Sequence, residues 1–210
     1  MKNIFTDFRS AVLFITILPA GNNVAYSPMG MIKFFPVVRL MLGSGLIFFD
    51  VIVSWLWAPG VAAVLDVIFL VVVTGAFHLD GLGDTADGMF SHQSKSRALE
   101  IMKDSRTGMM GLVAVFCTLA VKAAGIYSIK TGENLFQTLT LFLIIPAYSR
   151  AAMIFGIKFL NYGREKVGTG LDLFEKDIGL KDFGFFLIPV VISLSLGYKT
   201  LVLNFVFLAV

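Results

Sequence analysis

The sequence predicts an all-α protein, a polytopic transmembrane helical bundle of about five to six spans that follow an N-terminal interfacial helix. Hydrophobic residues make up 57% of the 210 residues and charged residues only 15%, whereas a typical soluble domain has about 45–50% apolar and about 25% charged residues. Several apolar runs also approach the roughly 20 residues that a helix needs to cross a hydrocarbon core of about 30 Å. This excess of apolar surface must face lipid.

The first predicted element is a helix that lies along the membrane surface and ends before Pro19. Its two sides differ in character, with apolar side chains at a four-residue spacing on one side and polar side chains on the other: Ile4, Phe8 and Val12 against Asp7, Arg9 and Ser10. This pattern is typical of a helix at the interface between lipid and water. The segment also loosely resembles a signal peptide, but its amphipathic pattern favours the interfacial helix.

Four apolar segments are predicted to span the membrane: 37–57, 61–77, 109–129 and 135–157. Two shorter segments follow at 183–196 and 201–210, and they form either two spans that meet at Gly197 or one bent helix. Cys117 is the only cysteine, so no disulfide can form within the chain. Neither an internal repeat nor a linker divides the sequence, which predicts a single integral membrane domain over residues 1–210.

The positive charges predict how these spans are oriented. Most of the 17 lysine and arginine residues fall on the same side as the N-terminus, Arg39, Lys122 and Arg150 lie within spans, and Lys130 and Lys199 fall on the opposite side. Because cytoplasmic loops contain an excess of positive charge, this distribution indicates a cytoplasmic N-terminus. No basic stripe with interleaved aromatic residues indicates a nucleic-acid partner, so the expected surroundings are those of a lipid bilayer.

The most informative stretch, residues 77–111, concentrates acidic side chains. Five of the chain's 14 aspartate and glutamate residues lie here: Asp80, Asp84, Asp87, Glu100 and Asp104. The three aspartates stand at i, i+4 and i+7, which places them on one face of a helix, and the last two residues stand at i and i+4. Two such faces turned toward each other would supply five carboxylates to one site.

Carboxylates gathered in this way repel one another, and a bound divalent cation is the usual means of offsetting the repulsion. Because all the ligands would be oxygen atoms, the sequence predicts Mg²⁺, with Mn²⁺ or Ca²⁺ as alternatives, rather than zinc. All five carboxylates are candidate metal ligands, and the catalytic candidates among them are Asp80, Asp84, Asp87 and Glu100. A solvated loop is the alternative explanation, but Asp80 directly continues an apolar span, where an acidic residue is costly and usually functional.

Basic residues near these carboxylates could bind an anionic substrate. Arg97, Lys103 and Arg106 alternate with the acidic residues and would complete a site for a metal-bound pyrophosphate. Arg39 and Arg150 lie in or near spans, where a guanidinium group either extends to the interface or binds phosphate bidentately, and Arg150 is a further candidate for phosphate binding. His78, beside the first aspartate, could be a ligand or a proton carrier, or simply a hydrogen-bonded residue at a helix end.

Several motifs in the chain resemble the cobalamin synthase family, the adenosylcobinamide-GDP ribazoletransferases. The match is densest in HLDGLGDTADG, which begins at His78, and in RALEIMKDSRTGMMG, which begins at Arg97. It extends to FITILP from Phe14, SRAAM from Ser149 and YGREKVGTG from Tyr162. The DxxDG pattern of residues 84–88 is also distantly similar to the CDP-alcohol phosphatidyltransferases.

The resemblance implies a magnesium-dependent phosphotransferase of the bacterial inner membrane, with its active site facing the cytoplasm. Family members join alpha-ribazole, or its 5'-phosphate, to adenosylcobinamide-GDP, release GMP, and form adenosylcobalamin or its 5'-phosphate. In this scheme the 5'-hydroxyl group of the ribazole attacks the β-phosphorus, and Asp80 or Glu100 accepts its proton. The resemblance also suggests a homo-oligomer, or other enzymes of the corrinoid pathway, as partners.

The chain departs from the family pattern at its end, and two other functions stay open. The family continues into a glycine-rich segment of the form GGxTGDxLGA, which we expect this chain to lack. One alternative is a lipid-headgroup enzyme like the CDP-alcohol phosphatidyltransferases, but Met89 and Phe90 interrupt its DxxDGxxAR pattern. The other is a divalent-cation transporter, which would place acidic residues on several spans near the middle of the membrane.

Overall fold

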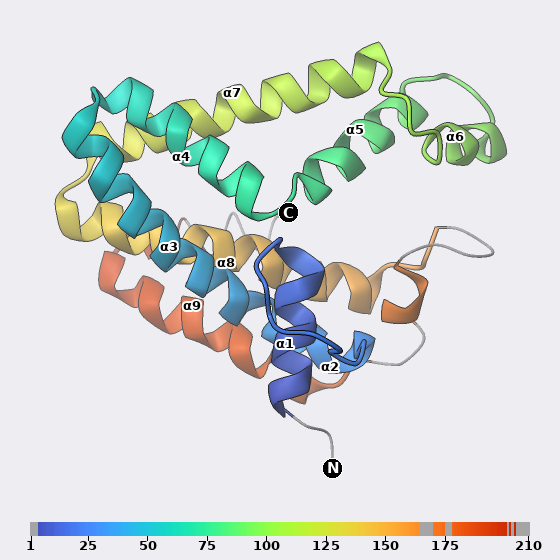
Figure 1. The fold of residues 1–210 in the computed structure, drawn as a ribbon, viewed down its shortest axis with the longest axis horizontal. Helices are drawn as coiled ribbons and strands as arrows, with labels where there is room; N and C mark the ends of the chain where they lie inside the picture. The colour runs from blue at the N-terminus through green and yellow to red at the C-terminus, as the bar shows by residue number, and fades with distance from the viewer. Residues whose placement is uncertain (1–3, 164–169, 175–177, 201, 203, 205–210) are drawn as a thin grey trace.

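The computed structural model describes residues 4–163, 170–174, 178–200, 202 and 204, and these ranges contain helices and no strand (Figure 1). The α-helices are α1 (Ile4–Ile15), α2 (Pro28–Met31), α3 (Phe35–Leu56), α4 (Pro59–Val73), α5 (Phe77–Met89), α6 (Lys95–Ile101), α7 (Met109–Gly132), α8 (Leu135–Phe159) and α9 (Leu187–Ser193). Short 3-10 helices cover Ile32–Phe34, Leu171–Leu173, Leu180–Phe186 and Leu194–Leu196. The predicted all-α class is confirmed.

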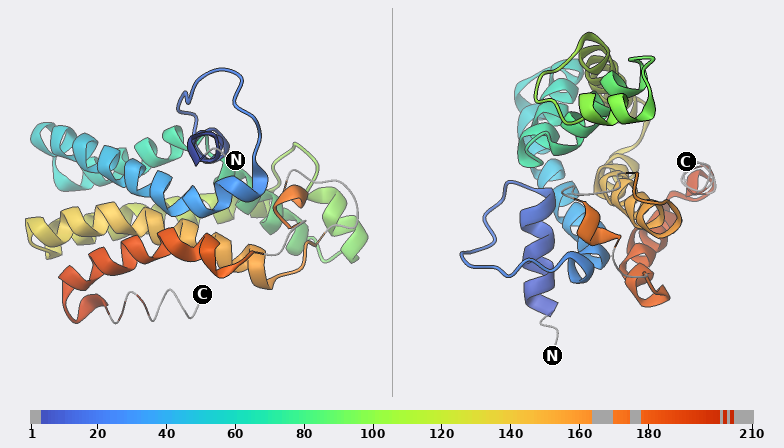
Figure 2. Two further views of the ribbon diagram at one scale, coloured as in Figure 1. Left: turned by 90° about the horizontal axis from the view of Figure 1, so that it is seen from below. Right: turned by 90° about the vertical axis from the view of Figure 1, so that its right-hand side faces the viewer.

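The helices form two layers that α3 and α4 connect. In the first layer α3 packs along α8, and α9 packs on the other side of α8 (Figure 2). In the second layer α7 packs against both α4 and α5. α3 and α8 lie close together at Gly43, where a Cβ atom would lie 2.5 Å from the carbonyl oxygen of Leu143. A larger residue at that position would therefore separate the two central helices.

The described residues contain fewer full spans than the sequence predicted. Three helical segments are long and apolar enough to cross a bilayer: Pro28–Leu56, Met109–Gly132 and Leu135–Phe159. A fourth span exists only if Pro59–Val73 and Phe77–Met89, which meet at an angle of 90°, count as one broken span. The predicted segment 183–196 falls within a shorter apolar helix, Asp182–Leu196, and the predicted segment 201–210 lies almost wholly outside the described residues.

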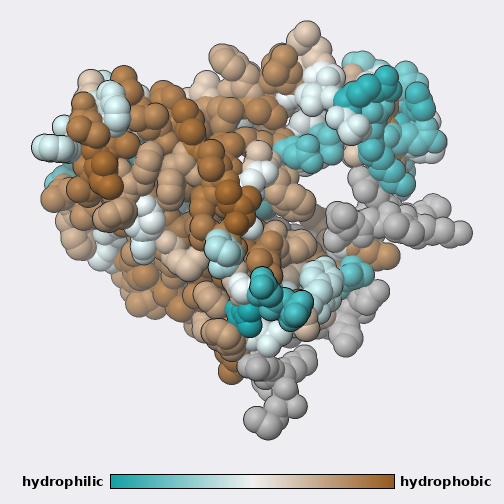
Figure 3. All heavy atoms as spheres, viewed as in Figure 1, coloured by the Kyte–Doolittle hydropathy of each residue, from teal (hydrophilic) through white to brown (hydrophobic). Residues whose placement is uncertain are grey.

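Apolar side chains cover the outside of the long helices. Phe48 of α3 and Phe116 and Val121 of α7 are largely exposed, and hydrophobic residues dominate the part of the surface that α3, α4 and α7 form (Figure 3). Hydrophilic residues gather instead around the loop and helix at the α5–α6 end (Figure 3). An apolar surface of this extent is expected to face lipid rather than water. The bundle therefore has one polar end, formed by α5 and α6.

Part of the polar side of the predicted interfacial helix α1 is buried inside the protein. Asp7 and Ser10 are both buried, while Ile4 on the predicted apolar side is exposed. The hydroxyl group of Ser27 donates to Asp7 Oδ1 (2.6 Å), and Lys33 Nζ lies 3.3 Å from Asp7 Oδ2. These partners come from α2 and its surroundings, so the periodicity of α1 alone could not reveal them.

A buried ion cluster connects α3, α4 and α7. Lys130 of α7 forms ion pairs with Asp50 of α3 and with Asp66 of α4, and its distance to Asp66 Oδ2 is 3.2 Å. The Lys130 side chain is 7% exposed and that of Asp66 is fully buried. Lys130 Nζ also donates to the hydroxyl group of Ser54 (2.8 Å). The ammonium group of Lys130 therefore connects three helices.

A sharp break separates α4 from α5. Gly75 and Ala76 both have positive φ angles, +59° and +55°, and such left-handed backbone is strained for alanine. A Cβ atom at Gly75 would lie 2.8 Å from the side chain of Ile17, whose backbone N–H donates to the carbonyl oxygen of Val73 (3.0 Å). The segment after α1 therefore packs against the break, which directs α5 back along α7.

We expect Lys130→Met to destabilise the protein more than Lys199→Met. Removing Lys130 leaves two buried carboxylates without a cation, and loss of one partner in a buried ion pair costs about 3–5 kcal/mol. Lys199 pairs with Glu133 where both side chains are partly exposed, and such pairs contribute about 0–1 kcal/mol. Thermal unfolding of the detergent-solubilised variants measures the difference, and equal losses would contradict it.

We expect Gly75→Ala to lower the free energy of unfolding by about 1–3 kcal/mol, because the substitution adds a strained left-handed residue and a contact with Ile17. Gly60→Ala is the matched control, since Gly60 lies in α4 with no atom within 4 Å of its Cβ position. The control should be neutral or slightly stabilising, because alanine favours a helix by about 1 kcal/mol over glycine. Thermal unfolding curves in one detergent compare the two variants.

Candidate functional site

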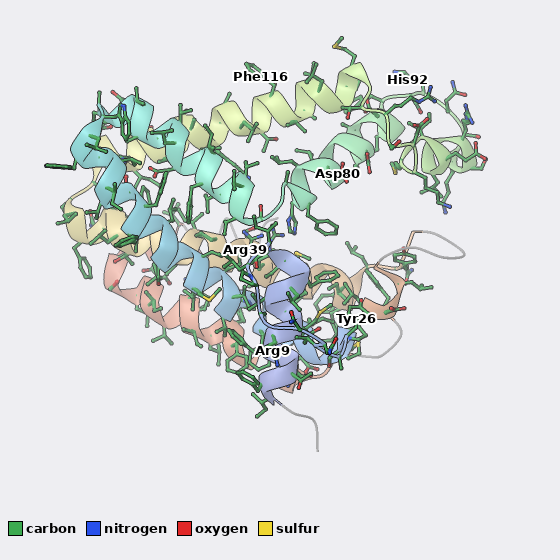
Figure 4. All side chains as sticks on the ribbon, in the orientation of Figure 1. Arg9, Tyr26, Arg39, Asp80, His92 and Phe116 are labelled. Atoms are coloured by element: carbon green, nitrogen blue, oxygen red, sulfur yellow. The ribbon has the colours of Figure 1, made fainter. Side chains whose placement is uncertain are left out.

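The acidic face predicted for residues 80–87 is present on α5. Asp80, Asp84 and Asp87 all lie within Phe77–Met89, so their spacing places them on one side of the helix. Asp80 is exposed, and the other two are half-buried (Figure 4). The helix packs against α7 at Gly83, where a Cβ atom would lie 3.9 Å from the Cα atom of Gly111.

Asp87 binds the N-terminus of α7. The backbone N–H of Gly108 donates to Asp87 Oδ2 (2.6 Å), and that of Gly111 donates to Asp87 Oδ1 (2.8 Å). The first N–H groups of a helix have no partner within the helix, and a negative charge is favourable beside them. A side chain at either glycine would collide with the carboxylate. Asp87 therefore has a structural role in positioning α7 against α5.

The predicted helical pairing of Glu100 with Asp104 is wrong, because α6 ends at Ile101. Glu100 is exposed and pairs with Arg97 (2.7 Å). Asp104 lies beyond the helix and accepts hydrogen bonds from the backbone N–H of Arg106 (3.0 Å to Oδ1) and from its guanidinium group, with Nε at 3.0 Å from Oδ1 and Nη2 at 2.5 Å from Oδ2. These hydrogen bonds hold the pKa of Asp104 at about 2. Two of the predicted phosphate-binding cations thus pair with two of the predicted metal ligands.

The five predicted metal ligands do not converge. Among the described residues, no group of three or more histidine, cysteine, aspartate or glutamate side chains is placed to hold a metal ion. Mg²⁺ nevertheless usually binds one or two carboxylates, with water and substrate phosphates as its other ligands. Asp84 meets this smaller requirement, since Asp80 and Asp87 each stand about one turn away on its own face of α5. The α5 face therefore fits a metal that a substrate shares.

The structure places Arg150 away from the other three predicted phosphate-binding residues. Arg150 is buried in α8 and lines a cavity inside the bundle, together with Arg39, Lys122 and His78. Lys103, by contrast, is exposed beside α6, as are the two arginines paired with Glu100 and Asp104. The signal in the sequence for this second cluster was the position of Arg39, Lys122 and Arg150 within apolar spans, together with the suitability of the two guanidinium groups for phosphate.

Three motifs that lie far apart in the sequence meet near the α4–α5 break. FITILP contributes Ile17, which packs on Gly75. HLDGLGDTADG contributes His78 and SRAAM contributes Arg150, and both line the cavity. In the motif YGREKVGTG, Tyr162 packs on Phe174 with their ring centroids 5.2 Å apart. Residues 164–169 of this motif lie outside the described residues.

Comparison with known proteins assigns these motifs to one family. The family of cobalamin-5-phosphate synthases matches residues 7–210. A similar protein from Desulforamulus reducens, named adenosylcobinamide-GDP ribazoletransferase, is 36% identical over 169 residues, which cover 80% of this chain and 66% of the relative. A protein of the same name from a Thermoanaerobacter species is 33% identical over 191 residues, which cover 90% of this chain and 73% of the relative.

A third relative covers nearly the whole chain. The adenosylcobinamide-GDP ribazoletransferase of Clostridium botulinum is 30% identical over 213 residues, 98% of this chain and 83% of the relative. This chain thus spans about two thirds to four fifths of the length of the three relatives. No solved structure matches it. Together with the motifs around the α4–α5 break, the match over residues 7–210 shows that the chain belongs to the cobalamin-5-phosphate synthase family.

Proposed function

We propose that this protein is an adenosylcobinamide-GDP ribazoletransferase, which joins alpha-ribazole or its 5'-phosphate to adenosylcobinamide-GDP and releases GMP. The observation that supports this most is the family match over residues 7–210. It agrees with an acidic face on α5 at the polar end of an apolar bundle. The product is adenosylcobalamin or its 5'-phosphate, according to the acceptor used.

In the proposed reaction a ribose hydroxyl group of the acceptor attacks the β-phosphorus of the GDP group. The bond from this phosphorus to the bridging oxygen breaks, and the bridging oxygen leaves with GMP. The attacking group is not the 5'-hydroxyl, because phosphate occupies that position in one of the two acceptors. Asp80 is better placed than Glu100 to accept the proton, since Asp80 is exposed at the start of α5 while Glu100 is paired with Arg97.

We also propose that Mg²⁺, or Mn²⁺ in its place, binds to Asp84 and to one neighbour on the same face of α5. The metal would neutralise negative charge on the diphosphate and on the departing GMP. Asp87 is the weaker neighbour, because its two oxygen atoms already accept backbone N–H groups from α7. Asp104 is the weakest ligand of the predicted set, because Arg106 already neutralises it.

The proposed location is the bacterial inner membrane, with the α5–α6 end facing the cytoplasm. The excess of lysine and arginine on this side supports the orientation, and the hydrophilic surface there supports contact with water. A partner, whether a second copy or another enzyme of the corrinoid pathway, could pack against α7, since only 6% of the most apolar part of this helix is buried.

The two alternative functions receive less support. A cation transporter needs carboxylates along a path through the spans, but the buried pair Asp50 and Asp66 is held by Lys130. A lipid-headgroup enzyme would use the same α5 face, yet the similar proteins described above bear the name of the ribazoletransferase. Substrate choice separates the two enzymes, and metal-dependent GMP release separates either enzyme from a transporter.

We expect purified protein to release GMP from adenosylcobinamide-GDP and alpha-ribazole only when Mg²⁺ is present. Asp84→Asn should lower the rate by about 100-fold or more, because it removes the carboxylate central to the metal site. Asp104→Asn, the matched control, should retain activity within about tenfold, because Arg106 already neutralises that carboxylate. Nucleotide chromatography measures the product, and an Asp84→Asn variant as active as wild type at limiting Mg²⁺ would exclude the assignment.

We expect Asp80→Asn to reduce kcat by about 10²–10⁴-fold with little change in KM, which is the effect of losing a positioned proton acceptor. Glu100→Gln tests the other candidate and should change kcat by less than about tenfold, since an exposed ion pair contributes about 0–1 kcal/mol. Steady-state kinetics of both variants decide between them. A larger loss of kcat in Glu100→Gln would reverse the assignment.

A further inference from the structure

A cavity of about 290 Å³ lies between the helices, and neither Glu100 of α6 nor Asp104 lines it. Four helices and the first turn of α5 form its walls, which include apolar residues such as Val67, Leu70 and Ile126. Three cationic side chains from three helices also line it: Arg39 of α3, Lys122 of α7 and Arg150 of α8. None of the lining residues that the structure describes has a carboxylate.

The two arginines are buried, and three of their nitrogen donors lack an acceptor among the described residues. Arg39 is 6% exposed and Arg150 is 9% exposed. Nε and Nη2 of Arg39 and Nε of Arg150 have no partner in the described part of the chain. Nη1 of Arg150 donates to the thioether sulfur of Met153 (2.8 Å), which is only a weak acceptor. Both ring nitrogens of His78 are likewise buried without a partner.

Two buried guanidinium groups, with the exposed Lys122 as a third cation beside them, are an unfavourable combination inside an apolar bundle. Arginine keeps its charge in proteins, and a buried charge without a partner is strongly destabilising. The charges of Arg39 and Arg150 repel each other, and both repel Lys122. The same bundle neutralises its other buried cation, Lys130, with two carboxylates. The missing counter-charge in the cavity is therefore expected to come from a ligand.

Extension of the arginine side chains to the membrane surface does not explain this arrangement. A snorkelling arginine places its guanidinium group in water or among lipid headgroups. Here Nε and Nη2 of Arg39 and Nε of Arg150 are buried. The two helices that bear these arginines, α3 and α8, pack directly on each other. Arg39 lies close to the junction where α4 turns into α5 (Figure 4). The two side chains thus line the same cavity between the helices.

The cationic cluster of Arg39, Lys122 and Arg150 is suited to an anionic ligand. Guanidinium groups bind phosphate oxygens bidentately, and two arginines with one lysine match a group with two or three negative charges. We propose that this cavity is a phosphate-binding site, in which Arg39 and Arg150 bind the phosphoryl oxygens and Lys122 supplies the third positive charge. His78 contributes a ring nitrogen from the wall. The site differs from the α5 carboxylate face and needs no metal.

Two sources could supply the phosphate group. One is a soluble phosphate compound, such as the diphosphate of the proposed nucleotide substrate. This diphosphate would then lie beside His78 in the first turn of α5, and His78 stands two residues before Asp80. The other is the headgroup of an anionic phospholipid that enters between the helices. The proposal concerns the shared phosphate chemistry and does not depend on ribazoletransferase activity, so it can succeed or fail separately from the proposed function.

The test uses inorganic pyrophosphate and delipidated full-length protein in detergent, with EDTA present so that no metal can mediate binding. Pyrophosphate should raise the unfolding temperature of the wild type and of Lys95→Gln, a control that removes one exposed positive charge from α6. Its apparent affinity should fall at least about tenfold in Arg39→Gln and in Arg150→Gln. Without ligand, both cavity variants should be as stable as the wild type or more stable, because an unpaired buried charge has been removed.

A second variant and a second measurement distinguish the remaining explanations. Arg39→Lys keeps the charge but loses the bidentate geometry, so it should fold and yet bind pyrophosphate more weakly than the wild type. Native mass spectrometry of protein that has not been delipidated tests the lipid source: an anionic phospholipid should remain bound to the wild type and be lost in Arg150→Gln if a headgroup occupies the site. The proposal is overturned if neither pyrophosphate nor phospholipid binding depends on Arg39 and Arg150.

Discussion

Charge inside an apolar bundle must find its counter-charge within the protein or in a ligand, and this constraint organises the whole structure. Hydrocarbon cannot solvate an ammonium, guanidinium or carboxylate group, so an unpaired charge there is strongly unfavourable. At one end of the bundle Lys130 meets Asp50 and Asp66, which joins three helices. In the central cavity Arg39 and Arg150 meet no carboxylate among the described lining residues. The first cluster stabilises the fold, and the second is suited to binding.

The break between α4 and α5 determines where the functional residues lie. Two successive left-handed residues, Gly75 and Ala76, turn the chain through 90°, and Ile17 packs against the turn. A continuous helix would have carried the α5 aspartates straight on from the apolar span. Because the chain turns instead, α5 packs along α7 and its first turn lines the cavity. The strained residue Ala76 thus lies where the carboxylate face of α5 adjoins the proposed phosphate-binding cavity.

Carboxylates of the same acidic stretch have different tasks because their surroundings differ. Asp87 accepts two backbone N–H groups and holds the start of α7, while Asp104 and Glu100 are neutralised by nearby arginines. Asp80 and Asp84 lie nearer the cavity end of α5, where a diphosphate bound by Arg39 and Arg150 would meet them. The two proposals thus concern adjoining sites, with cations lining the cavity and carboxylates on the face of α5.

The sequence by itself determined the properties that depend on local pattern. Composition and the lengths of apolar runs predicted the helical membrane class, the spacing of Asp80, Asp84 and Asp87 predicted their common face, and the motifs predicted the family, which the comparisons confirmed. Tertiary structure decided the partners: Ser27 and Lys33 bury Asp7, Arg106 neutralises Asp104, and Arg150 joins Arg39 rather than Arg97. The physical reason is that periodicity follows from the geometry of one helix, whereas the environment of a charge depends on which distant segments pack around it.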